Sequence, residues 1–355
     1  MNVTPASPSP AAFEQALGFH RAGQLDQAEY LYREILKIQP RHSDSLHLLG
    51  VAERQRGRND EAVKMIREAI VIDGSVAAYH CNLGNALGDL DLNDEAIEAY
   101  GNAILLRPDF AEAHFNLGNV LSKRGRAEAA IAAFSQAVRY RPDFCEAHTN
   151  LGVALANAGR RDDAVAAHCT AIRHNPNFAD ARYNLGVVLN DLGYFAQAAQ
   201  SFEAALKLRP GHADTQINLG NSLCEAGQTR EAALAFEAGL QLDPDNAEAH
   251  NGLAVVQLAM GKVTEAIAAA RSALLLRPDY AEAHNNLGNA LKDLGCFEEA
   301  AEAYNAAIEI RPDHATAYSS LLLCQHYRGD LTGAAILLET RRFSARFGRL
   351  KQNAA

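Results

Sequence analysis

The chain has 355 residues and a formal net charge of −10, and 48% of its residues are hydrophobic although only 7% are aromatic. The negative charge argues against a general role in binding nucleic-acid phosphates. No run of about 18 apolar residues occurs, so no membrane-spanning helix is expected. The six cysteines are spaced unlike a zinc site or a disulfide framework, which favours a reducing compartment and a cytoplasmic protein.

The chain begins with "MNVTPASPSP", a stretch rich in proline, serine and threonine. It lacks the charged start and the apolar centre of a secretion signal. We expect residues 1–10 to form a disordered lead. A divergent first repeat is expected over residues 11–42.

Three residue types then recur with a period of 34 residues. Alanine does so from residue 28 to residue 334 without a break, and glycine from residue 23 to residue 329 with one exception, Asp91. Proline follows the same period from residue 40 to residue 312, with Gly74 at its one gap. Such regularity indicates stacked modules that bury an apolar core together.

Each unit is predicted to form two antiparallel helices. In residues 111–144, apolar residues spaced three and four apart define one face of a first helix, which Gly125 ends in a left-handed conformation. The small Gly118 lets a second helix approach closely, and Phe134 of that helix fills the space beside it. Pro142 closes the second helix.

The Pro-Asp turns are predicted to start the next helices. Asp143 is expected to cap the following helix, with Glu146 three residues later completing a capping box. The same device is expected at the pairs Asp109/Glu112, Asp245/Glu248 and Asp279/Glu282.

These patterns predict an all-α fold, a right-handed superhelical α-solenoid of about nine to ten helix-turn-helix repeats. Eight 34-residue units are expected over residues 43–314, followed by a terminal helix pair over residues 315–355. Over about residues 11–340 the pattern resembles the tetratricopeptide repeat (TPR). The resemblance implies an adaptor that holds peptides or partner proteins. Its motif residues, quoted from one unit, are N-L-G at 116–118, Gly125, Ala130, Phe134, Ala137 and Pro142.

Asparagine recurs on the predicted first helices, and it is our candidate for peptide binding. An amide offers a donor and an acceptor, which suits a peptide backbone of any sequence, although it can equally bond to neighbouring backbone. The line breaks at Gly252, which favours the middle of the array, residues 77–220. One line is Asn82, Asn116, Asn150, Asn184, Asn218 and Asn286, and a second, three residues further on, is Asn85, Asn119, Asn221 and Asn289.

Other recurring polar residues have simpler explanations. A carboxylate near the start of most first helices favours helix-start chemistry over an acidic stripe for basic partners. The recurring histidines His80, His114, His148, His250 and His284 would not converge on a metal, so we expect packing and surface roles and no cofactor. No nucleotide-binding or hydrolase motif occurs, so no enzyme activity is expected in this chain.

The end of the chain is basic and amphipathic. Phe343, Phe347 and Leu350 form an apolar stripe beside Arg346, which predicts either a capping helix or a docking helix for a partner. The stretches "SSLLLCQHY", "GDL" and "RRFSARFG" also resemble the region that joins repeats to catalytic domain in bacterial O-linked N-acetylglucosamine transferase (Spindly-like) proteins.

Two hypotheses follow. The first is a scaffold that holds an extended partner segment in the concave groove of the solenoid. The second, implied by the transferase resemblance, is the substrate-recognition region of a protein glycosyltransferase, with the asparagines holding substrate and the catalytic domain as a separate partner. Neither hypothesis involves nucleic acid or a membrane, and neither names the partner or its motif.

Overall fold

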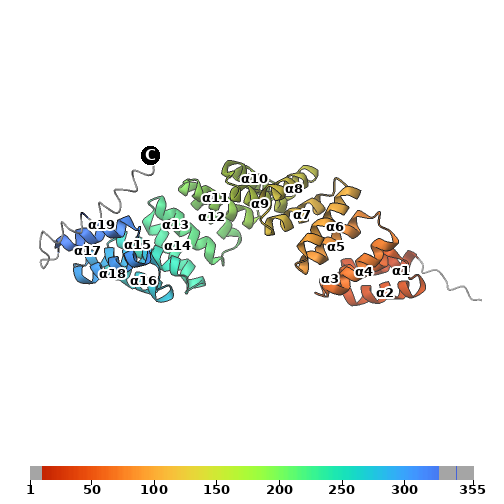
Figure 1. Ribbon diagram of the computed structural model, residues 1–355, viewed down its shortest axis with the longest axis horizontal. Helices are drawn as coiled ribbons and strands as arrows, with labels where there is room; N and C mark the ends of the chain where they lie inside the picture. The colour runs from red at the N-terminus through yellow and green to blue at the C-terminus, as the bar shows by residue number, and fades with distance from the viewer. Residues whose placement is uncertain (1–9, 328–340, 342–355) are drawn as a thin grey trace, which may run out of the picture. The chain divides into compact units, whose positions relative to one another are not determined.

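The computed structural model describes residues 10–327 and residue 341. These residues form nineteen α-helices and no β-strand, which confirms the all-α prediction (Figure 1). The first helices of the hairpins are α1 (Pro10–Arg21), α3 (Ser43–Gln55), α5 (Ala77–Asp89), α7 (Ala111–Lys123), α9 (Cys145–Asn157), α11 (Ala179–Asp191), α13 (Ala213–Glu225), α15 (Ala247–Ala259), α17 (Ala281–Asp293) and α19 (Ala315–Tyr327). The second helices are α2 (Leu25–Ile38), α4 (Asn59–Ile72), α6 (Asn93–Leu106), α8 (Ala127–Tyr140), α10 (Arg161–His174), α12 (Phe195–Leu208), α14 (Thr229–Leu242), α16 (Val263–Leu276) and α18 (Phe297–Ile310).

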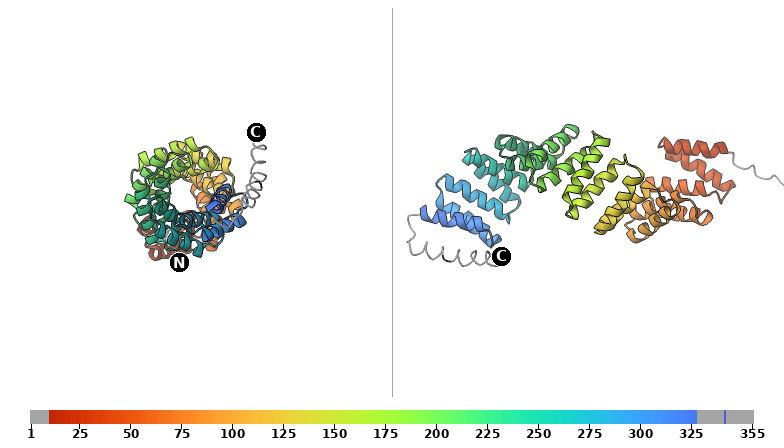
Figure 2. Two further views of the ribbon diagram at one scale, coloured as in Figure 1. Left: turned by 90° about the vertical axis from the view of Figure 1, so that its left-hand side faces the viewer. Right: turned by 90° about the horizontal axis from the view of Figure 1, so that it is seen from above.

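The helices belong to two compact units, divided in the sequence between Pro176 and Asn177. Unit 1 holds α1 to α10, and unit 2 holds α11 to α19. Within each unit, a first helix packs on the second helix of its own hairpin and on the second helix that precedes it. The hairpins of a unit therefore lie side by side in chain order, as in a solenoid (Figures 1 and 2).

Most hairpins are closed by a ring that lies on a glycine. A Cβ atom on Gly118 would stand 2.6 Å from Cε1 of Phe134, so no larger residue fits without movement. The hairpin of α15 and α16 has neither the glycine nor the ring. Buried Ala254 stands at the position of the glycine, and buried Ala270 stands at the position of the ring. Equivalent close approaches join Gly84 to Tyr100, Gly152 to His168, Gly186 to Phe202, Gly220 to Phe236 and Gly288 to Tyr304.

The turns within the hairpins confirm the predicted left-handed residues. Among the described residues, Asp91 is the one non-glycine residue with positive φ, at 59°. A side chain in this conformation costs about 1 kcal/mol relative to glycine. Eight glycines take φ values of 69° to 87° in the same turn: Gly23, Gly57, Gly125, Gly159, Gly193, Gly227, Gly261 and Gly295.

The predicted capping boxes are wrong. The N-cap of α9 is Phe144, one residue after Asp143, and no side chain caps this helix, so Glu146 completes no box. Packing decides the position, because the ring of Phe144 lies 4.7 Å from that of Phe115 and 3.5 Å below the guanidinium of Arg141. The other three predicted boxes fail in the same way, since the N-caps of α7, α15 and α17 are Phe110, Asn246 and Tyr280.

Polar residues at this N-cap position do cap their helices. Oδ1 of Asn246 accepts the Ala249 N–H at 3.0 Å, and Nδ1 of His42 accepts the Ser45 N–H at 3.1 Å. The cap is therefore the residue after the Pro-Asp turn, and it forms a hydrogen bond only where its side chain can accept one.

The recurring carboxylates of the first helices form ion pairs rather than caps. Oε1 of Glu112 lies 2.8 Å from Nη1 of Arg141, the residue that ends the second helix of the same hairpin. The side chains of each pair are partly exposed, so each ion pair contributes at most about 1 kcal/mol to folding stability. The equivalent pairs are Asp180–Arg209 at 3.0 Å, Glu248–Arg277 at 3.3 Å and Glu282–Arg311 at 2.7 Å.

Candidate peptide-binding face on the first helices

The predicted asparagines lie on first helices of both units. All are half-buried except Asn221, which is exposed. A half-buried amide can bond to protein on one side and to a ligand on the other. Unit 1 carries Asn82 and Asn85 on α5, Asn116 and Asn119 on α7, and Asn150 on α9, whereas unit 2 carries Asn184 on α11, Asn218 and Asn221 on α13, and Asn286 and Asn289 on α17.

In unit 1 the side-chain amides link successive first helices. Nδ2 of Asn82 donates to Nε2 of His47 on α3 at 2.8 Å. Nδ2 of Asn85 donates to Oδ1 of Asn82 at 3.2 Å, and Nδ2 of Asn116 donates to Oδ1 of Asn85 at 2.9 Å. Asn82 and Asn116 thus bond to side chains of the preceding repeat, and Asn85 bonds to Asn82 on its own helix. The alternative partner expected from the sequence is instead neighbouring backbone.

This network is uncharged at neutral pH. Burial lowers the pKa of His47 to about 4. An amide NH₂ group can only donate, so Nε2 of His47 carries no proton and the neutral ring is protonated at Nδ1. The hydroxyl of Tyr100 donates to Oδ1 of Asn85 at 2.8 Å, and burial raises the pKa of that hydroxyl.

Three of the asparagines meet at one hollow of about 240 Å³ in unit 1. Asn85, Asn116 and Asn119 line it together with the ring of Tyr100. Charged residues lie at its rim, and they are already paired: Nε of Arg54 lies 2.7 Å from Oδ2 of Asp89, and Lys123 pairs with Asp91. The hollow therefore presents neutral amides beside charges that are already paired.

Of the three asparagines, Asn119 is the one whose side-chain nitrogen has no hydrogen-bond partner among the described residues. Its Oδ1 accepts a hydrogen bond from Nδ2 of Asn150 at 2.8 Å. Its own Nδ2 has no hydrogen-bond partner within the described part of the chain. A ligand carbonyl could therefore bond there without displacing an existing contact.

Unit 2 uses tyrosine as well as asparagine. Nδ2 of Asn218 donates to the hydroxyl of Tyr183 at 3.1 Å. The hydroxyl of Tyr304 donates to Oδ1 of Asn289 at 2.9 Å, as Tyr100 does to Asn85 in unit 1.

The structure explains the break in the asparagine line at Gly252. A Cβ atom there would stand 2.5 Å from Cζ of Phe236, so the position must be glycine while that ring is in place. Asn251, one residue earlier, supplies the acceptor in this repeat. Its Oδ1 accepts a hydrogen bond from Nδ2 of Asn286 at 2.9 Å.

Two predicted residues of unit 2 stay outside this pattern. Neither Asn184 nor exposed Asn221 forms a side-chain hydrogen bond with another described residue. Asn184 instead lines a separate hollow of about 220 Å³ with Tyr183, Arg209 and His212.

The recurring histidines bond to backbone, in line with the packing interpretation. Nε2 of each donates to the carbonyl oxygen six residues earlier, where the preceding second helix has ended. No group of three or more potential metal-ligating side chains occurs among the described residues. The distances are 3.0 Å for His80 to Gly74, 2.8 Å for His114 to Pro108, 2.8 Å for His148 to Pro142, 2.9 Å for His250 to Pro244 and 3.0 Å for His284 to Pro278.

The predicted docking stripe at the C-terminus, Phe343, Arg346, Phe347 and Leu350, lies outside the described residues. None of the described helices is both long enough and apolar enough to span a bilayer.

Sequence reasoning missed several members of the network, among them His47, Asn251, Tyr100 and Tyr304. A signal for the tyrosines exists. Where the closing ring is tyrosine in these two hairpins, an asparagine stands 15 residues earlier, and the hydroxyl reaches it. His47 and Asn251 have a signal too, because both share one register position of the 34-residue period with Tyr183. Each of the three stands 35 residues before the asparagine that donates to it.

Two family models match the chain, and both are described as tetratricopeptide repeat. One covers residues 13–77, 81–143, 118–172, 149–213 and 217–283, and the other covers residues 281–314. Together they span most of the sequence, so the chain belongs to the tetratricopeptide repeat family. These matches concern the repeats, and the resemblance to O-linked N-acetylglucosamine transferases stays a prediction.

Solved structures share this fold. PilF of Pseudomonas aeruginosa is 21% identical with a TM-score of 0.52, and the match covers 58% of this chain and 94% of that chain. The Cut9–Hcn1 hetero-tetramer of APC/C is 20% identical with a TM-score of 0.52, covering 75% and 52%. YrrB, a TPR protein with an unusual peptide-binding site, is 24% identical with a TM-score of 0.47, covering 52% and 95%. No curated protein matches the chain.

Proposed function

We propose that this TPR chain is a non-enzymatic scaffold that holds an extended segment of a partner protein against its first helices. The observation that carries the proposal is the hollow where Asn85, Asn116 and Asn119 meet, with one amide donor unused. Neutral amides can bond a peptide backbone without selecting its side chains.

The spacing of the helices supports an extended ligand. Packed helices lie roughly 8–10 Å apart, and an extended chain advances about 3.3 Å per residue. A bound strand would thus meet the asparagines of a new first helix about every third residue. Within unit 1, the side-chain hydrogen bonds between α5, α7 and α9 hold those asparagines in fixed positions before a ligand arrives.

The test uses Asn119→Asp. The new carboxylate keeps an oxygen for Asn150 but replaces the unused donor with an acceptor, so the bond between α7 and α9 survives while the ligand loses its partner. Peptides of about 12 residues would be selected from a random library on the full chain, and their affinities measured by fluorescence anisotropy. We expect binding to weaken at least about tenfold.

Asn102→Asp is the matched control, because Asn102 is exposed on the second helix α6 and the change adds the same charge. It should leave affinity unchanged. The proposal fails if Asn119→Asp retains full helicity by circular dichroism and binds the selected peptides as tightly as the unmodified chain.

A second candidate rests on the sequence resemblance in "SSLLLCQHY" and "RRFSARFG". On this alternative, the array selects substrates for a protein glycosyltransferase whose catalytic domain is a partner. The chain would then bind a purified bacterial O-linked N-acetylglucosamine transferase domain, and a chain lacking residues 340–355 would not. This candidate is contradicted if the full chain and the shortened chain bind the transferase domain equally well, or if neither binds it.

A further inference from the structure

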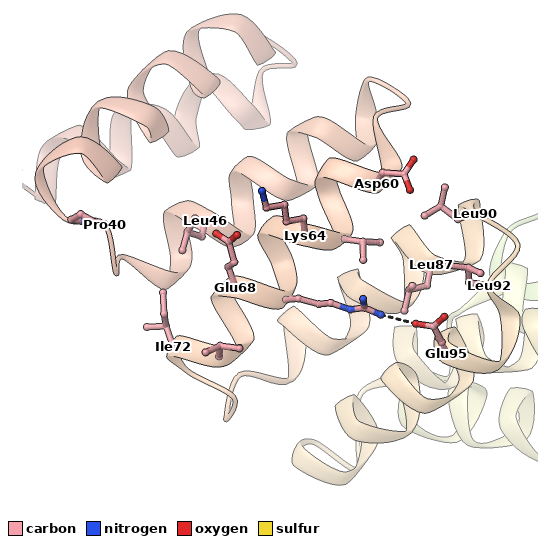
Figure 3. A pocket seen from close by; sticks show the side chains of 13 residues that line it. Pro40, Leu46, Asp60, Lys64, Glu68, Ile72, Leu87, Leu90, Leu92 and Glu95 are labelled. Carbon is pink, nitrogen blue, oxygen red and sulfur yellow. Dashed lines mark hydrogen bonds and ion pairs between the residues drawn. The ribbon is translucent and has the colours of Figure 1, made fainter.

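A large hollow of unit 1 lies beside a second helix and shares no lining residue with the hollow of the asparagines described above. It has a volume of about 740 Å³ and adjoins another of about 460 Å³. The two share Leu46, Lys64 and Glu68 as lining residues. We call the larger one, which Figure 3 shows, the α4 groove.

The α4 groove follows nearly the whole length of one helix. Its α4 residues are spaced three and four apart, which places them on a single face over about 18 Å, or three turns. They are Asp60, Val63, Lys64, Arg67, Glu68, Val71 and Ile72.

Outside α4, the lining of the groove is apolar except for Glu95. Leu87, Leu90 and Leu92 line the side opposite α4, where α5 turns into α6 (Figure 3). Val71 is 84% exposed and Leu92 is 43% exposed, so apolar surface is open to solvent here. Exposed apolar side chains beside a hollow offer a surface that a partner can cover.

The chain departs from its own repeat at this groove. Leu90 and Leu92 stand where the next unit has Arg124 and Arg126, and the previous unit has Arg56 and Arg58. The single break in the glycine series, Asp91, lies between the two leucines. The single break in the proline series, Gly74, follows Ile72 by two residues. Gly74, Asp91 and Leu92 thus depart from the repeat around one surface, whereas Leu90 does not, because leucine recurs at its position as Leu192 and Leu294.

Three charges in the groove, Asp60, Lys64 and Glu68, form no ion pair with another described residue. Arg67 is different, because its Nη2 lies 2.6 Å from Oε2 of Glu95. The groove therefore offers one unpaired cation, Lys64, with an unpaired anion one turn before it and another one turn after it, and these favour an occupant with the opposite order of charges.

The residues that line the groove also favour a helical ligand over an extended one. They are helices, whose backbone groups are already hydrogen-bonded, and no asparagine lines the groove. An extended segment would leave its own N–H and C=O groups without partners against Leu87, Leu90 and Leu92. A helix satisfies its backbone internally and presents an apolar stripe.

We propose that the α4 groove docks an amphipathic α-helix of about three turns from a partner protein. Its apolar residues, spaced three and four apart, pack on Val71, Leu90 and Leu92. An acidic residue faces Lys64 and a basic residue faces Glu68. This surface is separate from the asparagines, so one protein could hold an extended segment and a helical segment at the same time.

The probe is a designed peptide of about 14 residues with leucines on one face and one glutamate and one lysine at its edges. A scrambled peptide of the same composition has no apolar face. With the full chain, we expect fluorescence anisotropy to show binding of the designed peptide and circular dichroism to show that it becomes helical. Val71→Lys and Leu92→Lys should each weaken binding at least about tenfold.

Leu275→Lys is the matched control, because Leu275 occupies the position of Val71 in α16 and is also 84% exposed. It should bind the peptide normally. Lys64→Glu should weaken binding, and a peptide with its glutamate changed to lysine should restore it.

Equal binding of the designed and scrambled peptides would overturn the proposal, as would an equal loss in Leu275→Lys. A second copy of the chain is the rival occupant. If sedimentation shows that the unmodified chain dimerises and Val71→Lys is monomeric, the groove is a self-association surface instead.

Discussion

At the scale of single residues, His168 stands where neighbouring hairpins close with phenylalanine or tyrosine. It is 0% exposed, and neither ring nitrogen has a hydrogen-bond partner. Its ring packs beneath Gly152, where a Cβ atom would lie 2.5 Å from Cε1. Burial lowers its pKa from an ordinary value of 6.5 to about 4. The residue packs like a phenylalanine but leaves two polar atoms unsatisfied.

We expect His168→Phe to stabilise unit 1 and to reduce its sensitivity to acid. A histidine with a lowered pKa in the folded state is protonated more readily when unfolded, so stability is lost as pH falls from about 6.5 towards 4. The full loss is about 3 kcal/mol for this one group. Urea unfolding of the unmodified chain and of His168→Phe at pH 7 and pH 4.5 measures the loss of unfolding free energy in each protein.

The reverse change supplies the control. Phe202→His places an imidazole on Gly186 in unit 2 and should introduce the same acid sensitivity there. If His168→Phe keeps the pH dependence of the unmodified chain, this histidine is not the source.

Residue positions were easier to predict than their bonds. The period identified ten asparagines, yet it could not show that Asn116 donates to Asn85 or that Asn251 replaces the missing residue at Gly252. These partners depend on which side chains face each other between repeats. The constraint on Gly252 arises from the ring of Phe236, a contact that no spacing in the sequence expresses.

At the scale of helices, the hairpin of α15 and α16 indicates how substituting the closing glycine and ring affects the stability of the other hairpins. It keeps its packing with Ala254 and Ala270, where the hairpin of α7 and α8 has Gly118 and Phe134. Phe134→Ala alone should cost about 3–5 kcal/mol of stability through the cavity it leaves. Gly118→Ala alone should cost about 1–3 kcal/mol through the clash with the ring.

The double variant Gly118→Ala/Phe134→Ala should cost less than the sum of the two changes, because the added methyl group occupies part of the space that the ring vacates. Thermal unfolding of the four proteins in the cycle measures this coupling. If the two losses of stability add, the methyl group at residue 118 does not fill space left by the ring of Phe134.

Helix identity was predictable and helix starts were not. The apolar spacing and the positive-φ glycines define each hairpin, and both features are local. The N-cap was misplaced by one residue because Phe144 packs on Phe115 and Arg141, contacts made with other parts of the hairpin. Tertiary packing thus overrode the local capping preference of Asp143.

At the scale of the whole molecule, stability is distributed along the chain. Within each unit, the substantial contacts join helices one or two places apart. Phe236→Ala, in unit 2, should therefore raise amide hydrogen exchange in α13 to α15 and leave protection in α1 to α8 unchanged. Phe134→Ala should give the mirrored result, with the loss confined to unit 1. Uniform deprotection of both units by either change would contradict this nearest-neighbour behaviour.

Most side-chain amide hydrogen bonds between repeats point the same way, with Asn251, which donates forward to Tyr280, as an exception. Asn82, Asn116 and Asn150 each donate to the preceding repeat, and so do Asn218 and Asn286 in unit 2. Such an array has a polarity, like a strand in a sheet, and its two ends are chemically distinct. A backbone lying along it would meet donors and acceptors in a fixed sequence, so the chain should accept its extended partner in one N-to-C direction and reject the reversed one.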